Sequence, residues 1–448
     1  MKIIQSSEFD TYRKGRTVVE NDDAVDSAVK NIIAAVRSGG DTAVRSFASR
    51  FDRSSPQQLE VPLELVKQAA DDLLYKNANL SAAMELAAAN IRRFSEKQKE
   101  QFFDFECEMG EGLVAGQKVI PVEKAAVYVP AGRFPLFSSV LMGLIPAFCA
   151  GVDEVILASP PLEDGFPDRN ILAAAGIALN CFTGNSLFRV FAIGGAQAIA
   201  ALAIGTESVP RVDLIAGPGN KYVAAAKRLL YGDVGIDFIA GPSDVLVICD
   251  GMQSGGNGTQ AAELIAADMI AQAEHDPDAC GRALVSSGTL AEQVAAAIER
   301  QLDSLPTKET ARVSLESNGL IVVYNNREEA VHIANSIAPE HLELQTADDD
   351  WWLTRLKNYG SLFIGSLAAE ALGDYSAGIN HTLPTSGSAR FTGGLSVRHF
   401  LKTVTTLRCT GGEGFDKARH AAYVLAQAEG LSGHAASAEK RKELGSRE

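Results

Sequence analysis

The sequence predicts an α/β protein in which two doubly wound parallel-sheet units lie between small N- and C-terminal helical segments. Short apolar strands alternate with amphipathic helices twice, over residues 125–240 and over residues 241–383. The connections between them are short and rich in glycine. The flanking ranges 1–124 and 384–448 lack this alternation and have mainly helical periodicity.

The N-terminal region is expected to be mostly helical up to residue 105. Amphipathic patterns predict helices over 23–37, 66–74 and 81–97. Gly39 and Gly40 end the first helix, and Asn79 or Ser81 caps the third. The alternating residues 106–124 predict a hairpin. We expect this whole region, 1–124, to pack with the second α/β unit.

The first unit, residues 125–240, repeats a strand, a turn and a helix. Its strands are expected within AAVYVPAG, DEVILASPP, LFRVFAIGGAQ and VDLIAGPGN. Its helices are expected over 138–149, 170–178, 197–204 and 222–231. This order favours a parallel sheet.

The second unit, residues 241–383, has the same rhythm. Strands are expected within DVLVICD, RALVSS, LIVVYNN, HLELQT and SLFIGS. Helices are expected around Gln272, where Pro277 ends the helix, and over 290–302 and 328–337. The likeness of the two units suggests an old duplication.

The C-terminal tail, residues 384–448, leaves this rhythm. VRHFLKTVTTLRC indicates a passage from helix to strand, and helices are expected over 414–428 and 432–444. The tail is too short to form its own core, so we expect it to pack on another domain or another subunit.

Composition excludes several classes of protein. The 448 residues are 46% hydrophobic, and no stretch is long enough to span a bilayer. A net charge of −15 without a basic cluster makes nucleic acid and anionic membranes poor partners. The N-terminus lacks the pattern of a signal peptide, and six scattered cysteines without a CxxC predict reduced, mostly buried thiols in a cytoplasmic protein.

Three turns of the first unit could bind an anionic ligand. They span 129–133, 193–197 and 217–220, where small residues precede helix N-termini. A fourth, 241–243, lies at the junction of the two units. The standard dinucleotide and P-loop fingerprints are absent from the sequence. Each turn could be structural only, but three in one domain favour a nucleotide-type ligand.

All seven histidines lie at or after position 275, so chemistry that needs imidazole must use the second half of the chain. Gln272 and His275 are three residues apart at a helix end, which puts them on one face. Such a pair could be half of a metal site or a solvated surface.

Nine motifs together resemble the histidinol dehydrogenase family. They run from residue 125 to residue 434 in that family's order: YVPAGR, PLFSSVLM, GGAQAIAALAIGTESVP, GPGN, GPSDVLV, AQAEHDPDA, APEHLEL, GDYSAGINHTLPT and AEGLSGH. The resemblance implies two incomplete Rossmann-like units, a homodimer with sites made from both chains, NAD, and one Zn²⁺ per subunit. It also implies the oxidation of L-histidinol to L-histidine through L-histidinaldehyde in two hydride transfers, which are the last steps of histidine biosynthesis.

The resemblance assigns roles to particular residues. The zinc ligands would be Gln272, His275, Asp374 and His434, the last from the partner's tail. The catalytic residues would be Glu340, which activates water, and His341, which is the base in both oxidations. Substrate contacts would add Ser243, His381 and Glu429 to these six. The NAD contacts would be Tyr128, Gln197 and Asn220.

Some expectations come from the residues around these motifs. Pro339 should keep Ala338 extended, and Gly430 should break the helix between Glu429 and His434. His332, His399 and His420 match no motif and are expected to be surface or interface residues.

Two departures from the family pattern concern the cofactor region. Ala131 stands where the family commonly has a glycine before Gly132, and residues 179–186 form a longer connection.

Alternative functions remain open. A paralogous zinc- and NAD-dependent dehydrogenase of another small polar alcohol could keep the same ligands. A zinc hydrolase with Glu340 as the base would leave the glycine turns unexplained. A non-catalytic relative would have lost a ligand or the base, and neither is lost.

Overall fold

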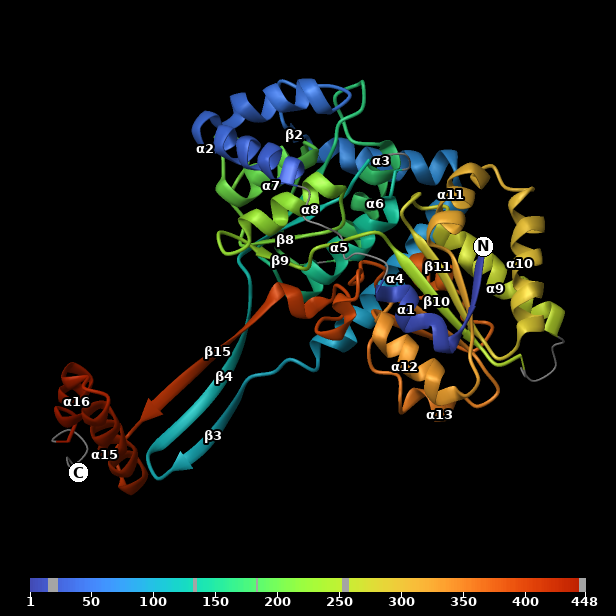
Figure 1. The fold of residues 1–448 in the computed structure, drawn as a ribbon. Helices are drawn as coiled ribbons and strands as arrows, with labels where there is room; N and C mark the ends of the chain where they lie inside the picture. Colours follow the sequence, from blue (N-terminus) through green and yellow to red (C-terminus); the bar gives the residue numbers. More distant parts are fainter. Residues whose placement is uncertain (15–22, 132–134, 183, 252–257, 443–448) are drawn as a thin grey trace.

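The structure, a computed structural model, describes residues 1–14, 23–131, 135–182, 184–251 and 258–442. Within these ranges, two six-stranded sheets form the body, and a three-stranded arm carries two helices away from it (Figure 1). The predicted α/β class with two parallel-sheet units is confirmed.

The first sheet has the strand order β2-β7-β6-β5-β8-β9. All neighbours pair in parallel except β2, which is antiparallel to β7. The strands are β2 (Glu60–Val61), β5 (Lys124–Tyr128), β6 (Glu154–Ser159), β7 (Leu187–Ala192), β8 (Leu214–Ala216) and β9 (Gly235–Ile236). The helices, each within two residues of its predicted ends, are α5 (Phe137–Ala150), α6 (Arg169–Asn180), α7 (Gly195–Ile204) and α8 (Lys221–Leu230).

The second sheet has the order β1-β12-β11-β10-β13-β14, with every pair parallel. Its strands are β1 (Lys2–Gln5), β10 (Asp244–Cys249), β11 (Cys280–Val285), β12 (Leu320–Val323), β13 (His341–Gln345) and β14 (Ser361–Ile364). Its helices are α9 (Gly258–Ala273), α10 (Gly288–Leu302), α11 (Lys308–Asn318), α12 (Arg327–Ile337), α13 (Asp349–Leu353) and α14 (Glu370–Tyr375). We did not predict α11, α13, α14 or β1.

The two sheets share one topology. Without their first edge strands, β2 and β1, both run third-second-first-fourth-fifth in chain order. This is the Rossmann order without its sixth strand. The shared order supports the duplication that the strand–helix rhythm suggested.

Each sheet is covered on both faces, as a doubly wound fold requires. On β6, Val155 and Leu157 pack into one buried cluster, while Ile156 and Ala158 pack into another on the opposite face. The second sheet is likewise covered by α9 to α11 on one face and by α12 and α13 on the other.

The N-terminal region packs mainly on the first unit, so its expected packing with the second unit was largely wrong. Helix α2 (Asp23–Phe51) packs on α7 and α8. Helix α3 (Leu63–Lys76) packs on α6, and α4 (Ala78–Lys99) packs on α5. The first strand, β1, extends the second sheet instead, and α1 (Phe9–Lys14) follows it. Helical periodicity identifies a buried face but not the surface that the face covers, which explains the error.

Two details of these helices differ from expectation. The helix α2 breaks at Gly40, whose φ is 49°, but it continues to Phe51. Helix α4 is capped by Asn77, whose side chain accepts a hydrogen bond from the Leu80 N–H at 3.1 Å. Neither Asn79 nor Ser81 is the cap, because the helix starts earlier than its pattern indicated.

The arm joins the hairpin to the C-terminal tail. The predicted hairpin is present as β3 (Phe105–Gly110) and β4 (Leu113–Pro121), and β15 (Leu401–Cys409) pairs antiparallel along β4. The tail helices α15 (Glu413–Ala428) and α16 (Ser432–Glu439) lie at the far end of the arm (Figure 1). The predicted end of the last helix, residues 443 and 444, lies outside the described residues.

None of the six cysteines, which all lie in described ranges, forms a disulfide, as predicted. Cys149 and Cys249 are buried, but Cys107 and Cys409 are exposed because they lie on the arm, so "mostly buried" was wrong. Among the described residues, no helix is long and apolar enough to cross a membrane.

Candidate active site

The predicted catalytic pair lies at the amino-terminal edge of the second sheet. His341 begins β13, Glu340 precedes it, and Asp244 begins the neighbouring β10. Parallel sheets usually bind ligands at their carboxyl edge, and the predicted turns of the first unit are at that edge. A contact of 3.0 Å between Ser139 Oγ, in the first turn of α5, and His381 Nε2 joins the two edges. The site is therefore built between the units.

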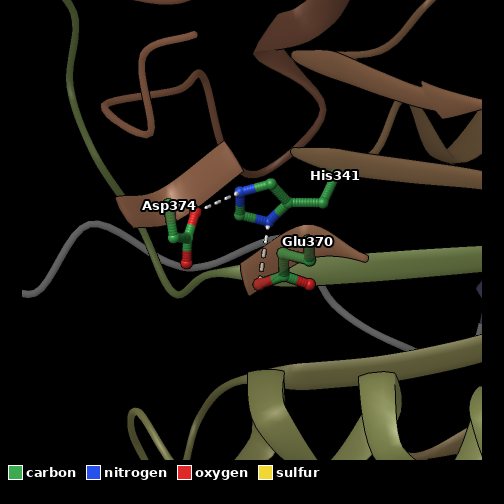
Figure 2. A group of neighbouring side chains, drawn as sticks. All are labelled: His341, Glu370 and Asp374. Carbon is green, nitrogen blue, oxygen red and sulfur yellow. Dashed lines mark ion pairs between the residues drawn. The ribbon is translucent and has the colours of Figure 1, made fainter. Parts of the chain in front are cut away.

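His341 lies between two carboxylates from one short helix. Glu370 and Asp374 are four residues apart on α14, so they share a face (Figure 2). Glu370 Oε1 is 3.4 Å from His341 Nδ1, and Asp374 Oδ1 is 3.6 Å from His341 Nε2. Gln272 Oε1, from the end of α9, is 3.0 Å from His341 Nδ1. All four side chains are buried.

This cluster contains polar atoms that lack partners. Among the described residues, four of its buried atoms accept or donate no hydrogen bond: Gln272 Nε2, His341 Nε2, Glu370 Oε2 and Asp374 Oδ1. Leaving such atoms unpaired costs about 1–3 kcal/mol each, so the cluster is suited to a ligand. His341, Glu370 and Asp374 also offer ligand atoms within 4.8 Å of one another. Imidazole, amide and carboxylate donors fit Zn²⁺.

The acids around His341 favour its protonated form. Burial alone would lower the pKa of His341, but the charges of Glu370, Glu340 and Asp374 raise it to about 10. Burial raises the pKa of Glu340 and of Glu370 to about 8. Burial would also raise the pKa of Asp374, yet the close approach and charge of His341 lower it overall. Three acids facing one imidazole favour the binding of a cation.

His275 and His381 belong to the same region. His275 lies exposed on the turn after α9, and its charge helps to lower the pKa of Asp374. His381 Nδ1 is 2.8 Å from the Asp374 carbonyl oxygen. Burial lowers the pKa of His381, which favours a neutral ring. The structure thus brings together five predicted residues: Gln272, His275, His341, Asp374 and His381.

Glu340 is held by residues that we did not predict. The Asp244 N–H donates to Glu340 Oε2 at 3.1 Å, and the Glu340 N–H donates to Asp244 Oδ1 at 3.0 Å. Arg282 Nη1 donates to Asp244 Oδ2 at 2.9 Å. The predicted substrate residue Ser243 immediately precedes Asp244, and its carbonyl oxygen accepts a bond from the Cys280 N–H. Asp244 directly follows the predicted turn at 241–243, and the sequence pattern does not single it out.

The segment before Glu340 does not have the expected conformation. Ala338 is left-handed, with φ 52°, and not extended. It ends α12, and its N–H donates to the Ala334 carbonyl oxygen. The demands of the helix end thus override the usual preference of a residue before proline.

Glu370 is the principal site residue that we missed. Its spacing of four residues from Asp374 was a usable signal. Behind it, Glu343 Oε1 accepts a hydrogen bond from the Glu370 N–H at 2.9 Å. Burial and the nearby Asp268 raise the pKa of Glu343 well above its usual value.

Two of the three predicted NAD contacts are internal. Tyr128 and Gln197 are 2% and 1% exposed. The Tyr128 hydroxyl accepts a hydrogen bond from the Gly195 N–H at 3.0 Å, and Gln197 Nε2 donates to Asp52 Oδ2 at 3.2 Å. Asn220 is exposed, and its side chain caps α8. The structure therefore places Asn220 at the surface and the other two side chains behind the turns.

The departures from the family pattern are only partly described. Ala131 makes an isolated bridge to Pro135. Residues 132–134 and 183, which include part of the turn at 129–133 and part of the connection at 179–186, lie outside the described residues.

Glu429 and His434 lie away from the other predicted residues. Together they line a hollow of about 390 Å³ between α15 and α16 at the tip of the arm. Gly430, with φ 77°, lets the chain turn between these helices, as expected. The tail helices α15 and α16 lie at the far end of the arm, away from the two sheets of the same chain (Figure 1). Of the unmatched histidines, His332 and His420 are exposed and His399 is partly buried.

Comparisons with known proteins agree on one family. The family model described as histidinol dehydrogenase matches residues 16–442. The chain is 45% identical to a histidinol dehydrogenase from Pseudomonas aeruginosa, covering 94% of this chain and 92% of that one. It is 43% identical to one from Nitrosospira multiformis, covering 97% and 95%. The crystal structure of histidinol dehydrogenase from Elizabethkingia anophelis superimposes with a TM-score of 0.88 at 32% identity, covering 99% of this chain and 98% of that one.

Proposed function

The chain belongs to the histidinol dehydrogenase family, and we propose that the cluster between its two units is the active site of this enzyme. It is an oxidoreductase that converts L-histidinol to L-histidine through L-histidinaldehyde. The observation that best supports the location is His341, which is buried between Gln272, Glu370 and Asp374 with Glu340 beside it in the chain.

Gln272, His275 and Asp374 are proposed to hold the zinc ion, together with His434 of the partner subunit. Asp374 Oδ1 has no hydrogen-bond partner among the described residues, and three carboxyl groups face the one imidazole ring of His341. Both features support this assignment. Zinc supplies charge that fixes and polarises the substrate, and it has no redox chemistry of its own to offer the hydride step.

His341 is proposed to accept the proton of the substrate hydroxyl; bound NAD would serve as the hydride acceptor. Glu340, Glu370 and Asp374 stabilise the imidazolium that results, because all three raise the pKa of His341. Positive charge from a bound metal and from the substrate ammonium would offset part of this effect and would leave the ring able to accept a proton.

Glu340 is proposed to activate the water that converts the aldehyde to its hydrate. Burial favours the protonated form of Glu340, and the hydrogen bond that it accepts from the Asp244 N–H favours the carboxylate. This balance gives a carboxyl group that can take a proton from water and return it. His341 then acts again in the second oxidation.

The dinucleotide is proposed to bind at the carboxyl edge of the first sheet. There the turn after β5 and the turn over 217–220 flank the point where the strand order reverses. Asn220 is accessible to the cofactor, and Tyr128 and Gln197 support the turns from behind.

A homodimer is proposed to complete the site. Glu429 and His434 lie with α15 and α16, and these helices are at the far end of the arm from the second sheet of the same chain (Figure 1). Glu429 of the partner subunit would contact the substrate, as would Ser243 and His381 of the first. The cytoplasmic location and the lack of nucleic-acid and membrane partners stay predictions.

The test is to count NADH formed per L-histidinol consumed by the zinc-loaded protein. We expect two per substrate, with loss of activity after chelation and recovery when zinc is returned. One per substrate would indicate an alcohol dehydrogenase that stops at the aldehyde. No NADH from L-histidinol, but NADH from another polar alcohol, would support the paralogue, and hydrolysis without NADH would support the zinc hydrolase.

A further inference from the structure

A buried ion pair lies beneath the turn at residues 217–220. Lys227 Nζ, from α8, and Asp237 Oδ1, from the loop after β9, are in direct contact. Their side chains are 3% and 0% exposed. Both residues belong to the first unit and are remote in sequence from the side-chain cluster around His341.

This ion pair binds both the backbone N–H and the backbone carbonyl oxygen of Gly217. The Gly217 N–H donates to Asp237 Oδ2 at 2.8 Å, and Lys227 Nζ donates to the Gly217 carbonyl oxygen at 3.0 Å. Asp237 Oδ1 also accepts a bond from the Phe238 N–H at 2.7 Å. The charged groups are therefore well satisfied by hydrogen bonds.

Stability alone does not explain a buried pair of this kind. Desolvation of two charges is costly, and an apolar pair of similar volume is often as stable or more so. A buried pair can instead specify one local geometry, and the geometry here is that of Gly217.

The turn is confined from its other side as well. Gly217 has φ 111°, and a Cβ there would lie 2.1 Å from the Tyr128 carbonyl oxygen. Tyr128 ends β5, and Gly217 follows β8; in chain order these are the first and fourth of the unit's five parallel strands, and they are neighbours in the sheet. The ion pair and the end of β5 thus fix the turn at the switch point from opposite sides.

We infer that Lys227 and Asp237 are positioning residues for the dinucleotide, because their ion pair fixes the shape of the 217–220 turn that receives it. This inference rests on the proposed cofactor site at that edge. The pair acts through the backbone of Gly217 and through Asn220, which the turn presents at the surface.

The test is the double variant Lys227→Met/Asp237→Asn, which leaves no unpaired buried charge. We expect the KM and the Kd for NAD to rise on the order of ten- to hundred-fold, because small displacements of positioning groups cost this much. The KM for L-histidinol, the zinc content and kcat at saturating NAD should stay within about threefold. Lys227→Arg, which keeps both charge and donors, should recover part of the affinity for NAD.

The matched control removes another ion pair of the same sheet. Lys124 Nζ and Glu154 Oε2, 2.9 Å apart, lie at the amino edge, away from the proposed cofactor site. Lys124→Met/Glu154→Gln should leave the Kd for NAD unchanged. An unchanged Kd for NAD in the Lys227 and Asp237 variant would overturn the inference. So would a joint loss of NAD, zinc and L-histidinol binding, because that pattern indicates general unfolding.

Direct titration with NAD separates this inference from the proposed function. If the wild type binds NAD but does not oxidise L-histidinol, the function is wrong and the ion pair is still testable. If the wild type oxidises L-histidinol and the double variant binds NAD as tightly as the wild type does, the positioning role of the ion pair is wrong and the proposed function stands.

Discussion

Asp244 and Glu340 each donate a backbone N–H to the other's carboxylate, at 3.1 and 3.0 Å. The two residues come from the starts of neighbouring strands and are 96 positions apart in the chain. Arg282 holds the remaining oxygen of Asp244. A proposed catalytic carboxylate is thereby tied to the framework of the second sheet.

The Asp244 side chain should therefore affect the chemistry that we assign to Glu340. Asp244→Ala leaves the Glu340 N–H without its acceptor, and we expect the aldehyde oxidation to slow on the order of tenfold or more. Asp244→Asn keeps an acceptor and should retain more of that rate. Single-turnover assays that start from L-histidinaldehyde would measure these rates. If Asp244→Ala and Asp244→Asn oxidised the aldehyde at the same rate, the proposed role of the Asp244 acceptor would be contradicted.

His341 is expected to be essential for turnover but not for holding zinc. His341→Asn should reduce kcat on the order of 10²- to 10⁴-fold, the usual contribution of a positioned base. Zinc content, measured by atomic absorption, should stay near one per subunit. A variant that turns over at the wild-type rate would show that another residue is the base.

Asp374 is expected to behave in the opposite way. Asp374→Asn removes a negative charge from the group of donors, so zinc and activity should be lost together. Metal analysis alongside NADH formation distinguishes this from the result at His341. Activity that persists without bound metal would rule out the assigned ligand role.

Sharing of the site between subunits can be tested by complementation. His434→Ala and His341→Asn should each be inactive alone. Co-expressed in equal amounts, they should recover about a quarter of wild-type activity, because half of the dimers are mixed and each mixed dimer has one intact site. No recovery from verified mixed dimers would mean that the tail serves its own chain.

Asp52 gives a pH dependence that is separate from the cluster around His341. Burial raises its pKa to about 6, although Gln197 and Gly194 donate hydrogen bonds to it. The folded protein thus binds this proton more tightly than the unfolded chain, so ionisation of Asp52 costs stability as the pH rises from about 4 to 6. A rise of this size corresponds to on the order of 3 kcal/mol.

Asp52→Asn should therefore gain stability relative to the wild type over that range and level off above it. Urea unfolding at pH 4.5 and pH 8 would measure the difference. A constant difference between the two proteins would contradict the raised pKa.

The alternation of strands and helices was predictable because buried parallel strands and amphipathic helices have distinct local patterns. The partners of the N-terminal helices were not predictable, since the apolar face of α2 is compatible with either unit. The strands β1 and β2 have only four and two residues, too few for a periodic signal.

The site was predictable in part. Gln272 and His275 share a helix end, and the motifs supplied Glu340, His341, Asp374 and His381. Contacts between distant segments, such as Asp244 with Glu340, have no signature in either segment alone. The burial of Tyr128 and Gln197 likewise depends on Gly195 and Asp52, which approach them only in the folded chain.

The arm has a consequence for how activity depends on the amount of protein. Because α15 and α16 lie far from the cluster around His341 (Figure 1), the proposed homodimer predicts that a newly made chain is inactive until it meets a second one. At low abundance, output should then grow with the square of the number of chains and become linear once pairing saturates. Dilution below the dissociation constant of the dimer should abolish activity while each chain stays folded.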